Sequence, residues 1–166
     1  TLAGTTLPVW DTGHTGGEGD YSLSFSGSGT ANNSPTAPHV LLGDLPDLKI
    51  TGNQTISMWV YPNTFATRQN PFAKAYGGEG TITQEPGREL TYYYGRSGTN
   101  GPPYDQFRTA PSLNLNAWNH IASVRDLANG QLHWYVNGTK STRPAAFTAA
   151  VAGTQPAYIG RGYTTN

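Results

Sequence analysis

Residues 113–138 contain the feature that most constrains the fold, two apolar runs separated by a polar turn. The runs, residues 118–124 and 132–136, have the alternating pattern of strands. Asn129-Gly130 lies between them and Asn137-Gly138 follows the second run. Asn and Gly tolerate the positive φ angles that tight hairpin turns need. The segment therefore predicts three successive antiparallel strands in a β-protein.

The composition agrees with a single β-domain over residues 1–166. The chain has 21 Gly and 12 Pro, and only 12% of its residues are charged, which favours turns and strands over helices. The formal net charge is zero and the ten Lys and Arg residues are scattered, which argues against nucleic-acid or anionic-membrane partners. Cysteine is absent and no apolar run approaches membrane-spanning length, so no disulfide, thiolate metal site or membrane insertion is expected.

Further strands are expected wherever a short run is apolar or alternates, at residues 21–26, 39–42, 55–61, 70–75, 90–94, 106–109 and 157–160. About ten short strands with frequent turns indicate a two-sheet antiparallel sandwich or jelly roll.

Three segments carry more specific expectations. Residues 55–61 are apolar on both faces, which predicts a central strand covered on both sides. Residues 77–88 are rich in Gly and Pro and predict a surface excursion, while residues 145–152 are expected to form a helical turn. Trp59, Trp118 and Trp134 lie within strand patterns and are expected in the core.

Five short motifs occur in a characteristic order: Ser-Leu-Ser-Phe-Ser-Gly at 22–27, Gln-Thr-Ile-Ser-Met-Trp-Val at 54–60, Ala-Trp-Asn-His-Ile-Ala at 117–122, Trp-Tyr-Val-Asn-Gly at 134–138 and Tyr-Ile-Gly at 158–160. Together they resemble the laminin G-like jelly-roll domain of the concanavalin A-like lectin/glucanase group. The resemblance implies two antiparallel sheets packed face to face, with ligands on the concave face or at the rim loops.

The chain departs from this family at both ends. Family members have outer strands before the first motif and after the last, and the sequence predicts that this chain lacks them. The departure predicts that the chain is a piece of a longer polypeptide, or that a protein partner or its own flanking segments fill the open sheet edges.

A second departure concerns calcium. Many relatives have Asp, which helps to hold a structural calcium, where this chain has Ser26. A hydroxyl brings no negative charge to a cation that needs several oxygen ligands. Nearby Asp20, Asp44 and Asp47 could compensate, and a Ca²⁺ site formed by them is therefore an expectation.

The sequence does not indicate an enzyme. Glycoside hydrolysis with retention needs two carboxylates roughly 5 Å apart, which on one strand means an i, i+2 pair. No Glu or Asp pair with that spacing lies in a predicted strand, and the four histidines lack metal-ligand spacing.

Tyrosines in Gly-rich loops are the candidate ligand-binding residues. Tyr76, Tyr104 and Tyr163 lie where a core does not require them, and sugar rings have apolar C–H faces that stack on aromatic rings. Asp105 follows Tyr104, and the same loop contains Arg96 and Asn100, which offer partners to sugar hydroxyl groups. The alternative is that these tyrosines pack their loops onto the sandwich.

The leading interpretation is a non-enzymatic binding or adhesion module for a glycan or glycoprotein. It would act outside the cell, at a cell surface or on a virion. The alternatives are a structural module that joins subunits of an extracellular or viral particle, and an accessory domain of a carbohydrate-active enzyme.

Overall fold

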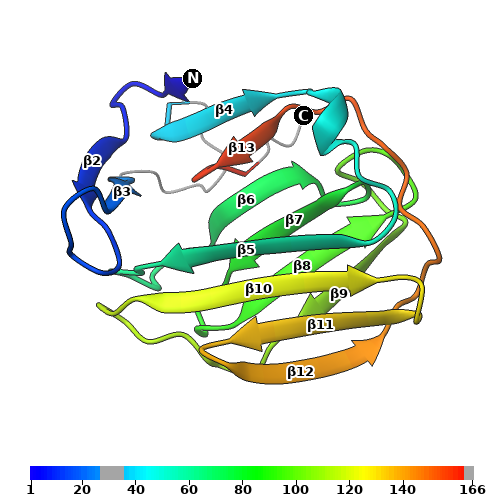
Figure 1. The fold of residues 1–166 in the computed structure, drawn as a ribbon. Helices are drawn as coiled ribbons and strands as arrows, with labels where there is room; N and C mark the ends of the chain where they lie inside the picture. Colours follow the sequence, from blue (N-terminus) through cyan, green and yellow to red (C-terminus); the bar gives the residue numbers. More distant parts are fainter. Residues whose placement is uncertain (27–35, 163–166) are drawn as a thin grey trace.

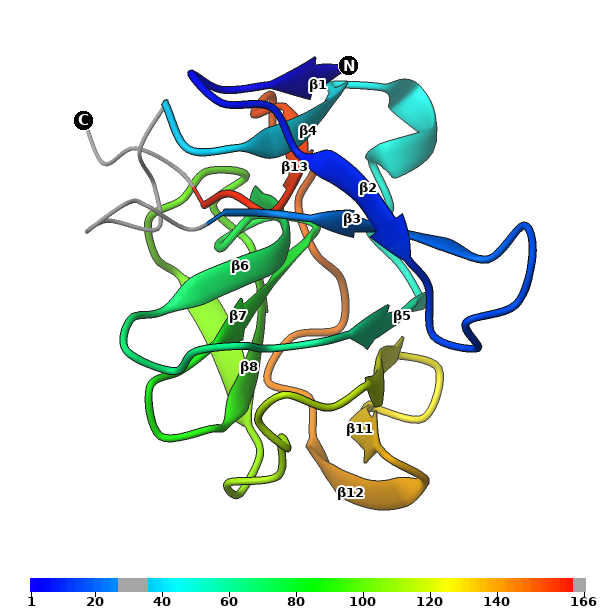
Figure 2. The ribbon, with the colours of Figure 1, turned by 90° about the vertical axis from the view of Figure 1, so that its left-hand side faces the viewer.

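The computed structural model describes residues 1–26 and 36–162 and contains two packed antiparallel sheets (Figures 1 and 2). The larger sheet has the strand order β1 (Leu2–Ala3), β4 (His39–Gly43), β13 (Ala157–Ile159), β6 (Gln69–Ala75), β7 (Gly80–Gln84), β8 (Leu90–Gly95) and β9 (Tyr104–Arg108). The smaller has the order β12 (Thr139–Pro144), β11 (Gln131–Val136), β10 (Asn119–Asp126) and β5 (Gln54–Val60). The predicted all-β sandwich is confirmed.

Two small elements complete the described chain. Strands β2 (Val9–Thr12) and β3 (Tyr21–Ser24) form a separate two-stranded sheet, the β2–β3 hairpin, at one side of the sandwich (Figure 2). A single 3₁₀ turn, η1, spans Pro46–Leu48. No helix in the described ranges is long and apolar enough to cross a membrane.

The three strands predicted from residues 113–138 are β10, β11 and β12. At the β11–β12 turn, Asn137 and Gly138 have φ angles of 50° and 82°, the conformation of a two-residue type I′ hairpin, and Val136 pairs with Thr139. At the β10–β11 turn, Gly130 has a φ of 63° and the Asn129 amide donates to Asp126. The turn residues therefore set the register as expected.

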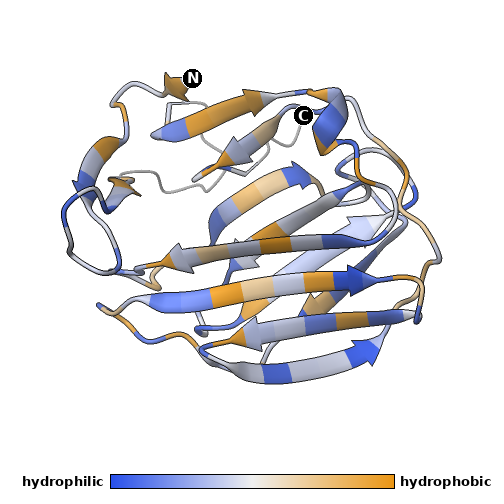
Figure 3. Cartoon of the chain, viewed as in Figure 1, coloured by the Kyte–Doolittle hydropathy of each residue, from blue (hydrophilic) through white to orange (hydrophobic). Residues whose placement is uncertain are grey.

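Alternation along the strands builds the core between the two sheets. Figure 3 shows apolar and polar residues alternating along β5 and β11. Ile82, Tyr92 and Phe107 face inward from the larger sheet, and Ile121 and Trp134 face them from the smaller. Trp134 is fully buried and its indole Nε1–H donates to the Phe107 carbonyl, as expected of a core tryptophan.

The prediction of a surface excursion over residues 77–88 is wrong for its central part. Gly80–Gln84 forms β7, a fully buried strand between β6 and β8. Thr81, Ile82 and Thr83 are β-branched residues that favour strands. Gly80 starts β7 with a φ of 145°, and a Cβ atom there would lie 2.9 Å from the Tyr92 ring. This glycine permits a close approach and does not mark a loop.

The prediction that residues 55–61 form a central strand covered on both faces is also wrong. Strand β5 lies at the edge of the four-stranded sheet in the described chain, and Trp59 and Tyr61 are 46% and 48% exposed. Their rings contact other aromatic side chains instead of a covering layer: Tyr61 contacts Trp118, and Trp59 contacts His14.

Residues 145–152 contain no helical turn, contrary to expectation. Their backbone amides bond to distant partners, which an α-helix would not allow. Ala145 donates to the Gly130 carbonyl, Ala150 to Thr51 and Val151 to Gly95. The segment therefore connects both sheets.

A buried guanidinium connects the two sheets at one end of the core. Arg125 on β10 is 0% exposed. Its nitrogens donate to the carbonyls of Ile50, Gly52 and Glu79 at 2.6–2.7 Å and to the Tyr92 hydroxyl at 3.2 Å. A buried charge is tolerated only when its donors are satisfied in this way.

We expect Arg125→Met to lower the free energy of unfolding by about 3–5 kcal/mol, because the carbonyls of Ile50, Gly52 and Glu79 and the Tyr92 hydroxyl lose a shared charged donor. Urea unfolding followed by fluorescence measures the loss. The matched control is Arg108→Met on the exposed surface of β9, which should change stability by less than about 0.5 kcal/mol. Equal effects of the two substitutions would contradict the role assigned to Arg125.

Tyr92 makes stability depend on alkaline pH. Burial raises the pKa of Tyr92 to about 12 from an ordinary 10.0. The folded chain keeps the phenolic proton at a pH where the unfolded chain releases it. Stability therefore falls as pH rises from about 10 towards 12, by about 2–3 kcal/mol in total.

Tyr92→Phe should flatten this decline in urea-unfolding experiments between pH 9 and about 11.5. A residual slope is expected because burial also raises the pKa values of Tyr76 and Tyr94. An unchanged slope in the variant would show that Tyr92 does not ionise as proposed.

Candidate functional site

The outer face of the seven-stranded sheet has small, polar and aromatic side chains in place of an apolar layer. Ile82 and Tyr92 face the core, so by alternation Thr81 and Tyr93 face outward. These two residues are paired across β7 and β8. This face lies along β6, β7 and β8 (Figure 2).

Three tyrosines pack together on this face and form what we call the tyrosine cluster: Tyr76, Tyr93 and Tyr104. The ring centroids of Tyr76 and Tyr93 lie 4.9 Å apart at an interplanar angle of 75°, and those of Tyr93 and Tyr104 lie 5.7 Å apart at 76°. Both contacts are edge-to-face, the favourable geometry for aromatic pairs. Tyr93 is 4% exposed, whereas Tyr104 is 41% exposed. Tyr104 is thus the accessible ring and Tyr93 supports it.

The β6–β7 turn and the loop after β8 position Tyr76. The Asn70 amide donates to the Tyr76 hydroxyl at 3.0 Å, and the Tyr76 main-chain amide donates to Asn100 Oδ1 at 3.4 Å. Burial raises the pKa of Tyr76, although the hydrogen bond from Asn70 acts in the opposite direction. The hydroxyl therefore stays protonated at neutral pH.

An ion pair lies on the same face at the other end of β7. Arg68 Nε donates to Glu85 Oε2 at 2.9 Å, and the Thr83 hydroxyl donates to Glu85 Oε1 at 2.6 Å. The Arg68 side chain is 39% exposed and the Glu85 side chain 7%. The face therefore combines one accessible guanidinium with aromatic rings and amide groups.

The structure brings together three of the five residues predicted to bind a ligand: Tyr76, Asn100 and Tyr104. Arg96 is exposed in the loop that follows β8. Asp105 lies on the opposite face from Tyr104, where it accepts from Arg143 and from the Ala146 amide. Tyr163 lies outside the described residues.

Sequence reasoning missed Tyr93, the residue in contact with both other tyrosines. Tyr93 lies between Tyr92 and Tyr94 in a strand that reads as apolar on both faces. Alternation along the strand puts Tyr93 on the opposite face from Tyr92 and Tyr94, but it does not show which of the two faces packs into the core. The structure shows that Tyr92 faces the core, and Tyr93 therefore faces outward.

The three predicted calcium ligands do not form a common site with each other in the described chain. Asp20 accepts from the Thr15 hydroxyl at 2.6 Å in the β2–β3 turn, Asp44 pairs with two lysines, and Asp47 lies in η1. No three carboxylate or imidazole groups converge in residues 1–26 and 36–162 in a way that could hold a metal. Calcium binding stays a prediction.

Substitution of Asp44 tests directly whether its carboxylate binds calcium. Its carboxylate lies 2.6 Å from the buried Lys74 ammonium and 2.9 Å from Lys49, and hydrogen bonds from these two lysines lower the pKa of Asp44. We expect Asp44→Asn to lower the urea midpoint equally in calcium and in EDTA, because it removes the nearer of the two carboxylates that pair with the buried Lys74 ammonium and leaves only Glu79 at 3.6 Å. Asp11→Asn, on the exposed strand β2 and not among the predicted ligands, is the control. If EDTA abolished the difference between Asp44→Asn and the native chain, the carboxylate would be a calcium ligand.

A second aromatic surface lies on the outer face of the four-stranded sheet. The His14 ring stacks on Trp59 with centroids 3.5 Å apart, and His120 contacts the same tryptophan at 5.1 Å. Tyr61 and Trp118 continue the group. Because His14 already covers one face of Trp59, this surface is less available for stacking than Tyr104.

Comparisons with known proteins agree with the fold. A family model described as the concanavalin A-like lectin/glucanases superfamily matches residues 34–166. No curated protein matches the chain in a sequence comparison.

Solved structures of similar fold have low sequence identity. One similar structure is domain 4 of AbnA, a GH43 extracellular arabinanase from Geobacillus stearothermophilus, solved in complex with arabinotriose. Its sequence identity to this chain is 18% and the TM-score is 0.66. The alignment covers 99% of this chain and 74% of that one. The CBM40 of the Ruminococcus gnavus IT-sialidase, bound to α2,3-sialyllactose, is 12% identical with a TM-score of 0.60, covering 93% and 77%. A putative carbohydrate-binding protein from Bacteroides ovatus is 18% identical with a TM-score of 0.57, covering 74% and 35%.

Proposed function

Because the chain belongs to the concanavalin A-like lectin/glucanase superfamily, we propose that it is a non-catalytic carbohydrate-binding module that binds a glycan at the tyrosine cluster. The observation that carries the proposal is the accessible Tyr104 ring, supported edge-to-face by Tyr93, which also contacts Tyr76. The partner would be a free glycan or the glycan of a glycoprotein.

The chemistry of the face suits a sugar. A pyranose or furanose ring has an apolar C–H face that can stack on Tyr104 and hydroxyls that need donors and acceptors. Asn100, which is partly exposed, lies beside Tyr76, and Arg68 provides a partly exposed charged donor. Such a combination of aromatic surface with a few placed polar groups is typical of small-molecule sites.

The carboxylate on this face supports binding in preference to hydrolysis. Arg68 and Thr83 donate to the two oxygens of Glu85, so neither oxygen is free of a donor. A glycosidase needs one carboxylic acid that protonates the leaving group and a second carboxylate that acts as a nucleophile or base. Asp105, the acidic residue next to Tyr104 in sequence, lies on the other face.

The relatives support a glycan partner and an accessory role. The arabinanase domain is one domain of an extracellular enzyme and was solved with arabinotriose, and the sialidase CBM40 was solved with sialyllactose. By analogy, this chain would act outside the cell, attached to or alongside a carbohydrate-active enzyme.

A glycan array identifies the ligand, and calorimetry of Tyr104→Ala tests the site. Loss of the stacking ring should weaken binding by about ten-fold or more, with no change in the urea midpoint beyond that of a surface substitution. Tyr61→Ala is the matched control, because Tyr61 is similarly exposed (48%) but lies on the four-stranded sheet.

Two results would overturn the proposal. If Tyr61→Ala or Trp59→Ala abolished binding while Tyr104→Ala did not, the glycan would bind on the four-stranded sheet. If no sugar bound and the chain instead polymerised with rising concentration, the structural or assembly alternative would be favoured.

A further inference from the structure

The β2–β3 hairpin exposes two large aromatic rings that the sandwich does not use. Trp10 and Tyr21 are each 69% exposed. Trp10 pairs with Leu23 and Thr12 with Tyr21, so the two aromatic residues are diagonal neighbours on one face of the hairpin. Their ring centroids lie 6.4 Å apart at an interplanar angle of 70°. The rings thus form two nearly perpendicular walls.

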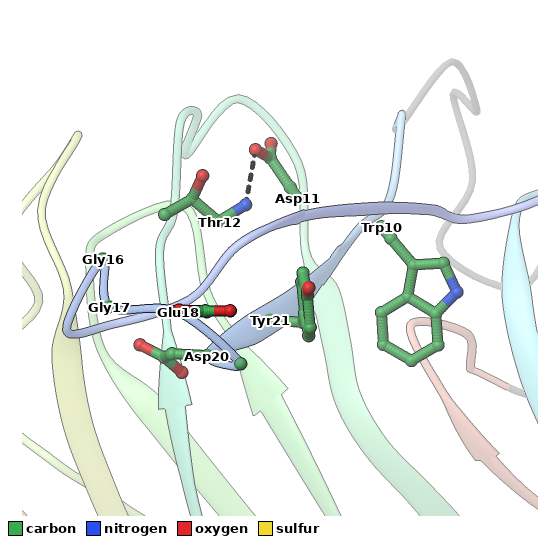
Figure 4. A pocket seen from close by; sticks show the side chains of 9 residues that line it. Trp10, Asp11, Thr12, Gly16, Gly17, Glu18, Asp20 and Tyr21 are labelled. Atoms are coloured by element: carbon green, nitrogen blue, oxygen red, sulfur yellow. Dashed lines mark hydrogen bonds between the residues drawn. The ribbon is translucent and has the colours of Figure 1, made fainter.

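Carboxylates line the same hollow. A cavity of about 450 Å³ on the hairpin is lined by Trp10, Tyr21, Glu18 and Asp20, together with main chain; Asp11 also borders it, but its side chain points away from the two rings (Figure 4). Asp11 accepts from the Thr12 amide, and the Glu18 side chain is exposed. Hydrogen bonds from the Thr15 side chain and amide lower the pKa of Asp20. The hollow therefore carries negative charge at neutral pH.

The charged side chains of the β2–β3 hairpin are acidic. Residues 9–24, which form the hairpin and its turn, contain three acidic residues (Asp11, Glu18 and Asp20) and no Lys or Arg. His14, the basic residue nearest in sequence, stacks on Trp59. A neutral protein thus has a locally acidic region, whose potential attracts cations.

We propose that the hollow on the β2–β3 hairpin binds an organic ammonium group. A cation beside an aromatic face is attracted by the ring quadrupole, and aromatic walls with nearby carboxylates are how proteins recognise quaternary ammonium groups. The two exposed walls contact the alkyl groups and Glu18 contributes opposite charge. This site lies away from the tyrosine cluster, and the proposal does not depend on the glycan site.

An NMR titration with tetramethylammonium chloride tests the proposal. The four tryptophans should give four indole N–H signals in ¹⁵N-labelled protein, assigned with a Trp10→Phe variant. The Trp10 signal should shift and saturate, with a Kd of roughly 10–100 mM for so small a ligand. The signal of Trp134, which is buried and bonded to Phe107, should not move and reports that the core is intact.

Controls separate cation recognition from other effects. Sodium chloride at equal ionic strength and tert-butanol, a neutral molecule of similar shape, should not reproduce the saturating shift. Glu18→Gln and Tyr21→Ala should each weaken binding about three-fold or more, whereas Glu89→Gln, which removes a carboxylate outside the hairpin, should not.

Three results would overturn the proposal: an equal response to tert-butanol, unchanged binding in both hairpin variants, or a Trp10 shift that depends on protein concentration alone. The last result would identify the hairpin as a contact between two copies of the chain. If tetramethylammonium did not bind, the glycan proposal would be unaffected, because glycan binding is tested separately with the Tyr104→Ala variant.

Discussion

The Arg125 guanidinium is the interaction on which the packing of the two sheets depends most. It lies on β10, one of the two central strands of the four-stranded sheet, and reaches the carbonyl of Glu79 just before β7. Its contacts with Ile50 and Gly52 also hold the segment that leads into β5. One buried charge thus joins both sheets and a connecting loop, at a desolvation cost that only complete hydrogen bonding offsets.

The same packing decides which aromatic residues are available for binding. Tyr92 and Tyr94 face inward, and Tyr94 stacks 5.3 Å from the Arg125 guanidinium, so Tyr93 between them must face outward. The tyrosine cluster is therefore a consequence of the register of β8. A one-residue slip would bury Tyr93 in the core and expose the two tyrosines that contact Arg125.

The sequence predicted the strands that carry strong local signals and failed where tertiary contacts decide. The β11–β12 turn followed from Asn137-Gly138, whose conformation is intrinsic to those residues. Strand β7 was missed because Gly80 and the flanking glycines read as loop residues, although the close approach of Tyr92 requires Gly80. The exposure of Trp59 was missed because periodicity shows that a strand has two apolar faces but not what covers them.

The candidate glycan site was predictable in part for the same reason. Tyr76, Asn100 and Tyr104 were identifiable because glycine-rich loops do not need aromatic residues for a core. Asp105 was placed with them by sequence proximity, but strand alternation sends it to the opposite face, where Arg143 binds it. Adjacent residues on a strand point in opposite directions, so proximity in sequence was the wrong criterion at that position.

Charge distinguishes the two proposed binding surfaces in a protein whose net charge is zero. The outer face of the larger sheet includes Arg68, whose side chain is 39% exposed, while the hairpin hollow has carboxylates and no basic residue among those that line it. The Arg68 charge is offset by its pairing with Glu85, whereas the carboxylates of the hollow would repel an anionic sugar and attract an ammonium group. The chemistry of the two surfaces therefore favours ligands of different charge.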